Sequence, residues 1–274
     1  MSICFLGDQH GNISNFLRVI DKIEKEHNPQ VYFQLGDFGF MGEGFLKFLK
    51  NVNKKMKSIN KNIYFIDGNH ENHNWLRKNQ IDDLTFIDSN VIYVKRGSII
   101  TLNEINLLCV GGAISTDRKY RKLNKSYWEE EGLTKEEIES ITKNLLKNKK
   151  EIDLFVTHDS PYKLDGLFNS NYFSNYSDCL KAIGHRKALQ HFFDLSKSII
   201  NIHGHNHKYY YDEIVEGNND NYYKNKIKYI EICLNCDDGK GQYMIFSKEL
   251  INQFKEDNYE SVYDYFLKNK EKKK

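Results

Sequence analysis

The sequence predicts an α/β fold with a partly parallel sheet. Over the first hundred residues, short apolar runs alternate with segments whose apolar residues recur at helical spacing. The first three of these runs end in glycine followed by polar residues. A β-α-β-α-β order of this kind predicts right-handed crossovers and parallel neighbouring strands. The 274 residues are enough for one large domain or two small ones with a real core.

The amino-terminal part of the chain supplies the alternating pattern. In chain order we expect a strand over 2–6, a helix with apolar residues from Ile13 to Ile23 that Asn12 caps, a strand over 31–35, a helix over 45–56 and a strand over 63–66.

The rest of the chain continues with strands and longer helices. We expect strands near 91–94, 99–102 and 105–110, a helix opened by the capping box of Thr134 and Glu137, a strand over 154–156, a helix over 180–195, a strand over 199–202, antiparallel strands within 209–246 with a turn at 217–221, and a final helix that carries Tyr259 and Leu267. We expect one domain over 1–250, in which 111–150 is an insertion that could act as a lid, and a helical, Lys-rich end over 251–274.

The composition excludes several classes of protein. Hydrophobic residues at 39% and aromatic residues at 14% argue against a disordered chain, and a formal charge of +2 argues against nucleic-acid binding driven by bulk charge. Five cysteines without a dense pattern argue against a disulfide scaffold and favour a reducing compartment, so we expect a cytoplasmic protein. We expect neither a signal sequence nor a membrane span, and the oligomeric state stays open.

Residues that can bind metal ions follow five of the predicted strands. They form the blocks Gly7-Asp8-Gln9-His10, Gly36-Asp37, Gly68-Asn69-His70-Glu71, Thr157-His158 and Gly204-His205-Asn206-His207. Because the carboxyl ends of neighbouring parallel strands meet at one edge of a sheet, these side chains should converge. Carboxylates, an amide oxygen and imidazoles without a thiol suit two divalent ions such as Mn, Fe, Zn or Co.

These five blocks, in this order, resemble the signature blocks of the calcineurin-like metallophosphoesterases, over positions 7 to 207. The resemblance implies a four-layer α/β/β/α sandwich with two packed mixed β-sheets. It also implies hydrolysis of a phosphoester with two divalent metal ions. We expect Mn first, with Fe, Zn, Co and Ni as alternatives.

The resemblance also implies a role for each residue of the blocks. It implies two ligand sets that share one carboxylate, with Asp8, His10 and His207 at the first ion, Asn69, His158 and His205 at the second, and Asp37 bridging both. A hydroxide that bridges the two ions would attack phosphorus, because coordination lowers the pKa of water to about 7. His70 would be the catalytic acid that gives a proton to the leaving alkoxide.

Two departures from the family's protein phosphatases bear on the substrate. Those enzymes have Asp-Arg-Gly after the second block, whereas Asp37 is followed here by Phe38 and Gly39. Their last block also lacks the second histidine of Gly-His-Asn-His. We therefore expect a phosphodiester, nucleotide or nucleic-acid substrate. The alternatives are a phosphomonoesterase or protein phosphatase and, from another class, an interaction module that binds little metal.

Several other residues are candidates for contact with the substrate. The forked donors of Arg118 and Arg121 suit a phosphate group, although a solvent-exposed loop whose positive charge is balanced by the glutamates of 129–131 is the slightly simpler explanation. We expect His203 to contact the substrate or to support the rim, and His73 to begin a helix at the surface. The tyrosines of 172–176 and 209–211 could stack a nucleobase or pack internally.

Overall fold

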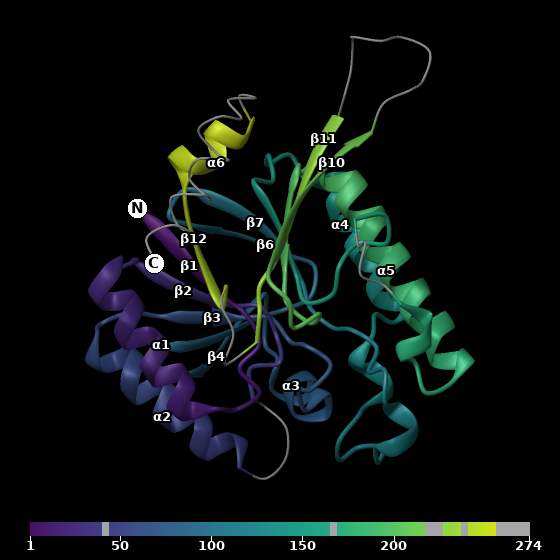
Figure 1. The fold of residues 1–274 in the computed structure, drawn as a ribbon, viewed down its shortest axis with the longest axis horizontal. Helices are drawn as coiled ribbons and strands as arrows, with labels where there is room; N and C mark the ends of the chain where they lie inside the picture. The colour runs from purple at the N-terminus through teal and green to yellow at the C-terminus, as the bar shows by residue number, and fades with distance from the viewer. Residues whose placement is uncertain (40–43, 165–168, 217–226, 237–240, 256–274) are drawn as a thin grey trace.

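Two six-stranded sheets face each other in this computed structural model (Figure 1), which describes residues 1–39, 44–164, 169–216, 227–236 and 241–255. The first sheet has the order β12 (Tyr243–Ser247), β1 (Ser2–Leu6), β2 (Val31–Gln34), β3 (Ile63–Phe65), β5 (Val91–Val94) and β4 (Leu84–Asp88). The second has the order β10 (Tyr210–Glu216), β11 (Ile227–Cys233), β9 (Ile200–His203), β8 (Leu154–Thr157), β7 (Ile105–Val110) and β6 (Ser98–Leu102).

Helices cover the outer face of each sheet (Figure 1). The helices α1 (Ile13–Glu26) and α2 (Phe45–Ser58) pack on the first sheet, and α4 (Lys135–Lys147) and α5 (Tyr176–Ser196) pack on the second. The shorter helices are α3 (His73–Asn79) and α6 (Lys248–Lys255). The arrangement confirms the predicted four-layer α/β/β/α sandwich.

Strand residues alternate between two separate cores. In β1, Ile3 and Phe5 belong to the core between the two sheets, whereas Cys4 and Leu6 pack with the residues of α1 and α2. Side chains in a strand point to opposite faces in turn, so a strand covered on both faces must be apolar throughout. This explains why the predicted strands read as continuous apolar runs.

The central strands of both sheets are parallel. In the first sheet β1, β2, β3 and β5 run in one direction, and in the second β7, β8, β9 and β11 do the same. Antiparallel strands flank them at the sheet edges. The segments that follow the parallel strands therefore gather at one rim of the sandwich.

The element boundaries differ from the sequence-based expectation at a few places. Helix α5 begins at Tyr176 rather than near 180, because the Asn175 side chain accepts a hydrogen bond from the Asp178 N–H at 2.8 Å and caps the helix there. The capping box of Thr134 and Glu137 is present as predicted. The expected turn at 217–221 and the helix around 259–267 lie outside the described residues. Within the described part of the chain, no helix combines the length and apolarity needed to cross a bilayer.

Candidate metal centre

The turns after the strands place several predicted ligands in the left-handed backbone region. The φ angles are 45° at His10, 50° at Asp37, 64° at His205 and 51° at His207. Few residues other than glycine adopt this conformation, and it is concentrated at functional sites, where the surrounding fold offsets its cost. Gly36 precedes Asp37 with φ 94°, and a Cβ there would lie 2.5 Å from Nδ1 of His158. Glycine is required at this close approach.

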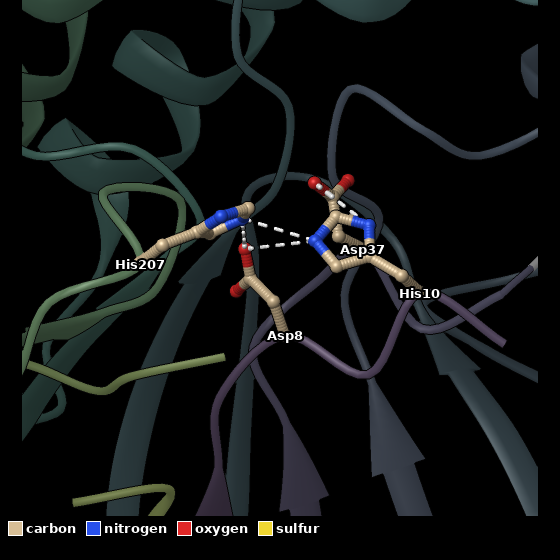
Figure 2. A group of neighbouring side chains, drawn as sticks. All are labelled: Asp8, His10, Asp37 and His207. Carbon is tan, nitrogen blue, oxygen red and sulfur yellow. Dashed lines mark hydrogen bonds and ion pairs between the residues drawn. The ribbon is translucent and has the colours of Figure 1, made fainter. Parts of the chain in front are cut away.

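Asp8, His10, Asp37 and His207 form the first group of donors, and Figure 2 shows the Asp8 carboxylate between two imidazole rings. Each residue offers one donor atom, and the four atoms lie within 4.8 Å of one another. Nε2 of His207 is 3.0 Å from Oδ2 of Asp8 and 3.0 Å from Nε2 of His10. Because Asp8 follows β1 and His207 follows β9, the group joins the two sheets.

Asp37, His158 and His205 form a second group, whose donor atoms also lie within 4.8 Å of one another. Oδ1 of Asn69 is 3.2 Å from Nε2 of His158. Nδ1 of His158 donates a hydrogen bond to the carbonyl of Leu35 at 2.7 Å, which orients the ring so that Nε2 faces the group. The structure thus brings six of the predicted ligands together in two groups that share Asp37, and it places the seventh, Asn69, beside His158 of the second group.

Electrostatics favour a charged Asp37, a neutral His205 and, in the absence of a cation, a protonated His158. Burial raises the pKa of Asp37, but the imidazoles of His158 and His70 more than offset this and hold the pKa well below its usual value. Burial lowers the pKa of His205 to about 4, whereas at His158 burial is outweighed by the Asp37 carboxylate, which raises the pKa to about 10, so a bound cation would replace the proton of that imidazole. Carboxylates and neutral imidazoles are the forms that coordinate cations, so the donor set fits two divalent ions.

A carboxylate that the sequence reasoning left without a role supports this turn. The buried side chain of Glu71 accepts hydrogen bonds from the backbone N–H groups of Asp37 at 3.0 Å, Phe38 at 2.8 Å and Gly39 at 3.3 Å, and from that of Gly68. Four amides of two different turns are therefore held by one side chain. Glu71 lies in the third sequence block, but the pattern of that block does not reveal which groups it contacts.

His70 lies beside the two groups and belongs to neither. Its backbone N–H donates to Oδ1 of Asp37 at 2.8 Å, and its Nε2 lies 3.9 Å from Oδ2 of Asp37. The terminal nitrogens of Arg121 lie 3.1 and 3.0 Å from the two ring nitrogens of His70. Burial and, to a smaller extent, the positive charge of Arg121 lower the pKa of His70, while Asp37 opposes the shift.

A pocket of about 600 Å³ opens above these residues. His10, His70 and the other rim residues form one side of it, and Arg121 and Lys208 add positive charge. Two aromatic residues, Tyr172 and Phe173, also line the pocket. The pocket therefore combines charged and metal-binding side chains with aromatic ones.

Two residues that the sequence suggested as substrate contacts, Arg118 and His203, do not line this pocket. Arg118 is only 5% exposed, pairs with Glu131 at 2.9 Å and Asp178 at 3.2 Å, and is outside the pocket lining, so its position argues against the predicted contact with phosphate. His203 is fully buried in β9, 3.2 Å from both Glu231 and the hydroxyl of Tyr210, which argues against substrate contact and favours an internal role. Arg121, by contrast, lines the pocket.

His73 begins α3 as expected, but it is buried rather than at the surface, because its ring packs beside Asp67 and Trp128. Trp128 is itself almost fully buried and anchors the segment after β7. The predicted surface position of His73 is therefore wrong. The burial of His73 could not be predicted from its position at a helix start, because it results from contacts with residues that are distant in the sequence.

The buried side chain of Arg96 connects the segment after β7 to the first sheet. Arg96 pairs with Asp67, with 2.6 Å between Nη2 and Oδ2, and donates to the backbone carbonyls of Glu130 and Glu131 at 3.0 Å each. Arg96→Ala would leave Asp67 buried without its partner. We expect it to lower the free energy of unfolding by about 3–5 kcal/mol. Urea denaturation followed by circular dichroism measures the loss.

Arg77 is the matched control for this prediction. It pairs with the same Glu137 that Arg96 reaches, at 2.9 Å, but its side chain is 39% exposed. Arg77→Ala should cost less than about 1 kcal/mol, as is usual for an exposed ion pair. Equal losses for the two variants would contradict the role given to Arg96.

Comparison with known proteins agrees with this geometry. A family model described as calcineurin-like phosphoesterase matches residues 1–209. No curated protein matches the chain significantly. A dimetal phosphatase from Danio rerio superposes with a TM-score of 0.50 at 12% identity, over 86% of this chain and 88% of that one. A second crystal structure superposes with a TM-score of 0.54 at 10% identity, over 89% and 94% of the two chains. At these identities the two structures support the fold alone.

Proposed function

This chain belongs to the calcineurin-like phosphoesterase family, and from that premise we propose that it is a metal-dependent phosphoric ester hydrolase with two divalent ions. One observation carries the proposal. Two groups of donor atoms, each within 4.8 Å, meet at the rim of the sandwich and share the carboxylate of Asp37. A shared carboxylate between two cations offsets their mutual repulsion and favours a paired site over two separate ones.

The ligand sets follow from the two groups. Asp8, His10 and His207 would hold one ion, Asn69, His158 and His205 would hold the other, and Asp37 would bind both. Mn²⁺ is the first candidate for this mixture of oxygen and nitrogen donors. When bound, the ions supply Lewis-acid activation of the phosphoester and of a water molecule.

The neighbouring residues orient the substrate and move a proton. His70 is outside both ligand groups and lines the pocket, and its imidazole would give a proton to the leaving oxygen once the guanidinium of Arg121, which lies 3.0 Å from Nε2, moves to the phosphate. Arg121 lies against His70 and faces the same pocket, where its guanidinium can bind a phosphoryl oxygen. Arg121 therefore takes the phosphate-binding role that the sequence suggested for two arginines.

We propose a phosphodiester or a nucleotide as the substrate. The residue after Asp37 is the fully buried Phe38, so no arginine at that position can bind a second set of phosphoryl oxygens. The aromatic rings of Tyr172 and Phe173, which line the same pocket, suit a planar organic group on the substrate. A phosphomonoester is the second candidate, because Arg121 and Lys208 together supply the positive charge that a dianion needs.

A metal-loaded substrate screen tests the proposal. The protein is saturated with Mn²⁺, its metal content is measured, and it is given bis-p-nitrophenyl phosphate, p-nitrophenyl phosphate, cyclic nucleotides and single-stranded DNA. We expect about two ions per chain and faster hydrolysis of the diesters. Faster hydrolysis of p-nitrophenyl phosphate would select the monoester alternative. A protein that binds two ions and hydrolyses none of these substrates would overturn the proposal, and one that binds none would support the interaction module.

Arg121 provides a test of phosphate binding. Arg121→Ala should lower kcat/KM by about tenfold to a hundredfold, because a hydrogen bond to a charged group contributes about 1.5–3 kcal/mol. Steady-state kinetics on the best substrate of the screen measures the change. Lys122→Ala, which removes an exposed cation next to Arg121 but outside the pocket lining, should leave kcat/KM unchanged. Equal losses of kcat/KM in the two variants would contradict a specific contact between Arg121 and the phosphate, and would indicate that only the net positive charge of the segment affects the rate.

A further inference from the structure

We propose that Ser115 and Glu131 are positioning residues that decide which end of the Asn69 side-chain amide faces the second metal group. The inference rests on the proposed function, since it assigns these residues to the support of one of its ligands. Both residues follow β7 in the segment that the sequence suggested as a lid. The proposal gives this segment a function at the metal centre instead.

A chain of hydrogen bonds connects the three side chains. Nδ2 of Asn69 donates to Oγ of Ser115 at 2.9 Å, and Oγ of Ser115 lies 3.0 Å from Oε2 of Glu131. The backbone N–H of Ser115 donates to the other oxygen, Oε1, at 2.8 Å. The exposed fractions are 2% for Asn69, 1% for Ser115 and 0% for Glu131, so the chain is closed to solvent.

The chemistry of the three groups sets the direction of every hydrogen bond. A carboxylate can only accept, so the single hydroxyl proton of Ser115 points to Glu131. The lone pairs of the hydroxyl are then left for Asn69, whose NH₂ end must turn toward Ser115. Oδ1 of Asn69 consequently faces His158, at 3.2 Å from Nε2. Only this oxygen can bind a cation, because the amide nitrogen has no available lone pair.

The position of Glu131 is fixed in turn by two arginines. Nε of Arg118 lies 2.9 Å from Oε1 of Glu131, and Arg96 holds the backbone carbonyl of the same residue at 3.0 Å. Burial raises the pKa of Glu131 to about 7, and the hydrogen bonds of Ser115 and the charge of Arg118 oppose the shift. The carboxylate form therefore predominates at pH 8, which is the condition chosen for the test.

The experiment is a Mn²⁺ titration at pH 8, followed by calorimetry and by electron paramagnetic resonance. Ser115→Ala should weaken the second ion about tenfold to a hundredfold, the usual effect of removing a residue that orients a metal ligand, and leave the first ion unchanged. The coupled two-ion signal should give way to that of isolated Mn²⁺. Glu131→Gln should act in the same way. Its side-chain amide can donate a hydrogen bond to Ser115, which would reverse the direction of the hydrogen bonds between residue 131, Ser115 and Asn69.

Three further variants separate orientation from general damage. Ser115→Thr keeps the hydroxyl and should retain the second ion. Asn69→Asp offers an oxygen on either side, so adding Ser115→Ala to Asn69→Asp should have little further effect on metal binding. Ser198→Ala removes another buried and hydrogen-bonded hydroxyl, before β9 at the opposite end of the strands, and should leave both ions unchanged.

The outcomes distinguish this inference from the proposed function. If the unaltered protein binds two ions and Ser115→Ala does too with the same affinities, the positioning role is overturned and the proposed function stands. If Ser115→Ala weakens both ions equally and Ser115→Thr does the same, the residue is only structural. If the unaltered protein binds fewer than two ions, both proposals fall.

Discussion

Replacing Asp37 by asparagine is expected to abolish turnover and to weaken metal binding at both donor groups. Asp37 is 1% exposed and contributes an oxygen to each group, so the substitution removes one negative charge from two sites at once. We expect a loss of about 4 kcal/mol in transition-state stabilisation, which is about a thousandfold in rate. Metal content and the rate on bis-p-nitrophenyl phosphate are measured on the same preparation.

Asp153→Asn is the matched control. Asp153 is also 1% exposed, but it precedes β8 and pairs with Lys248, at the end of the strands opposite the candidate site. This variant should lose stability and keep both ions and full activity per folded molecule. Two bound ions and normal turnover in Asp37→Asn would refute the assignment of the shared carboxylate.

Replacing His70 by alanine is expected to slow catalysis without removing metal. The imidazole lies next to Asp37 but belongs to neither donor group, so the metal content should stay the same. Loss of a general acid costs about a hundredfold to ten-thousandfold when the leaving group needs a proton. An alkyl phosphodiester should therefore slow far more than an aryl one, whose phenolate departs without protonation.

The comparison of the two substrates is the internal control of this experiment. Loss of phosphate binding or of folded protein would slow both esters by the same factor. Equal slowing would therefore exclude His70 as the proton donor, and so would loss of metal in His70→Ala.

The fold was predictable because its main determinants are local or periodic. The apolar run at 2–6 is followed by a helical pattern that Asn12 caps, and both features are present as expected. The helix α3 was expected only from its first residue, His73, and the strand β4 was not foreseen, because Thr85 and Asp88 interrupt its apolar residues. Their positions depend on packing against the rest of the first sheet.

The candidate site was predictable to the extent that it follows from strand ends. Parallel strands bring their carboxyl ends to one rim, so residues as distant as Asp8 and His207 could be expected to meet. Arg118 and Arg121 could not be told apart, since the single turn of Arg118–Tyr120 sends one inward and the other to the pocket. Glu71 and Ser115 act through backbone amides and a hydroxyl, and such contacts leave no pattern in the chain.

Because the ligands come from both sheets, metal binding would affect the stability of the whole folded molecule. Asp8, Asp37 and Asn69 follow strands of the first sheet, whereas His158, His205 and His207 follow strands of the second. Ions bound between them cannot be retained if either sheet unfolds or the two separate. By mass action, each tenfold rise in free ion above its dissociation constant would then add about 1.4 kcal/mol per site to the folding equilibrium. In the proposed enzyme, the concentration of free metal therefore sets the resistance to unfolding as well as the catalytic competence.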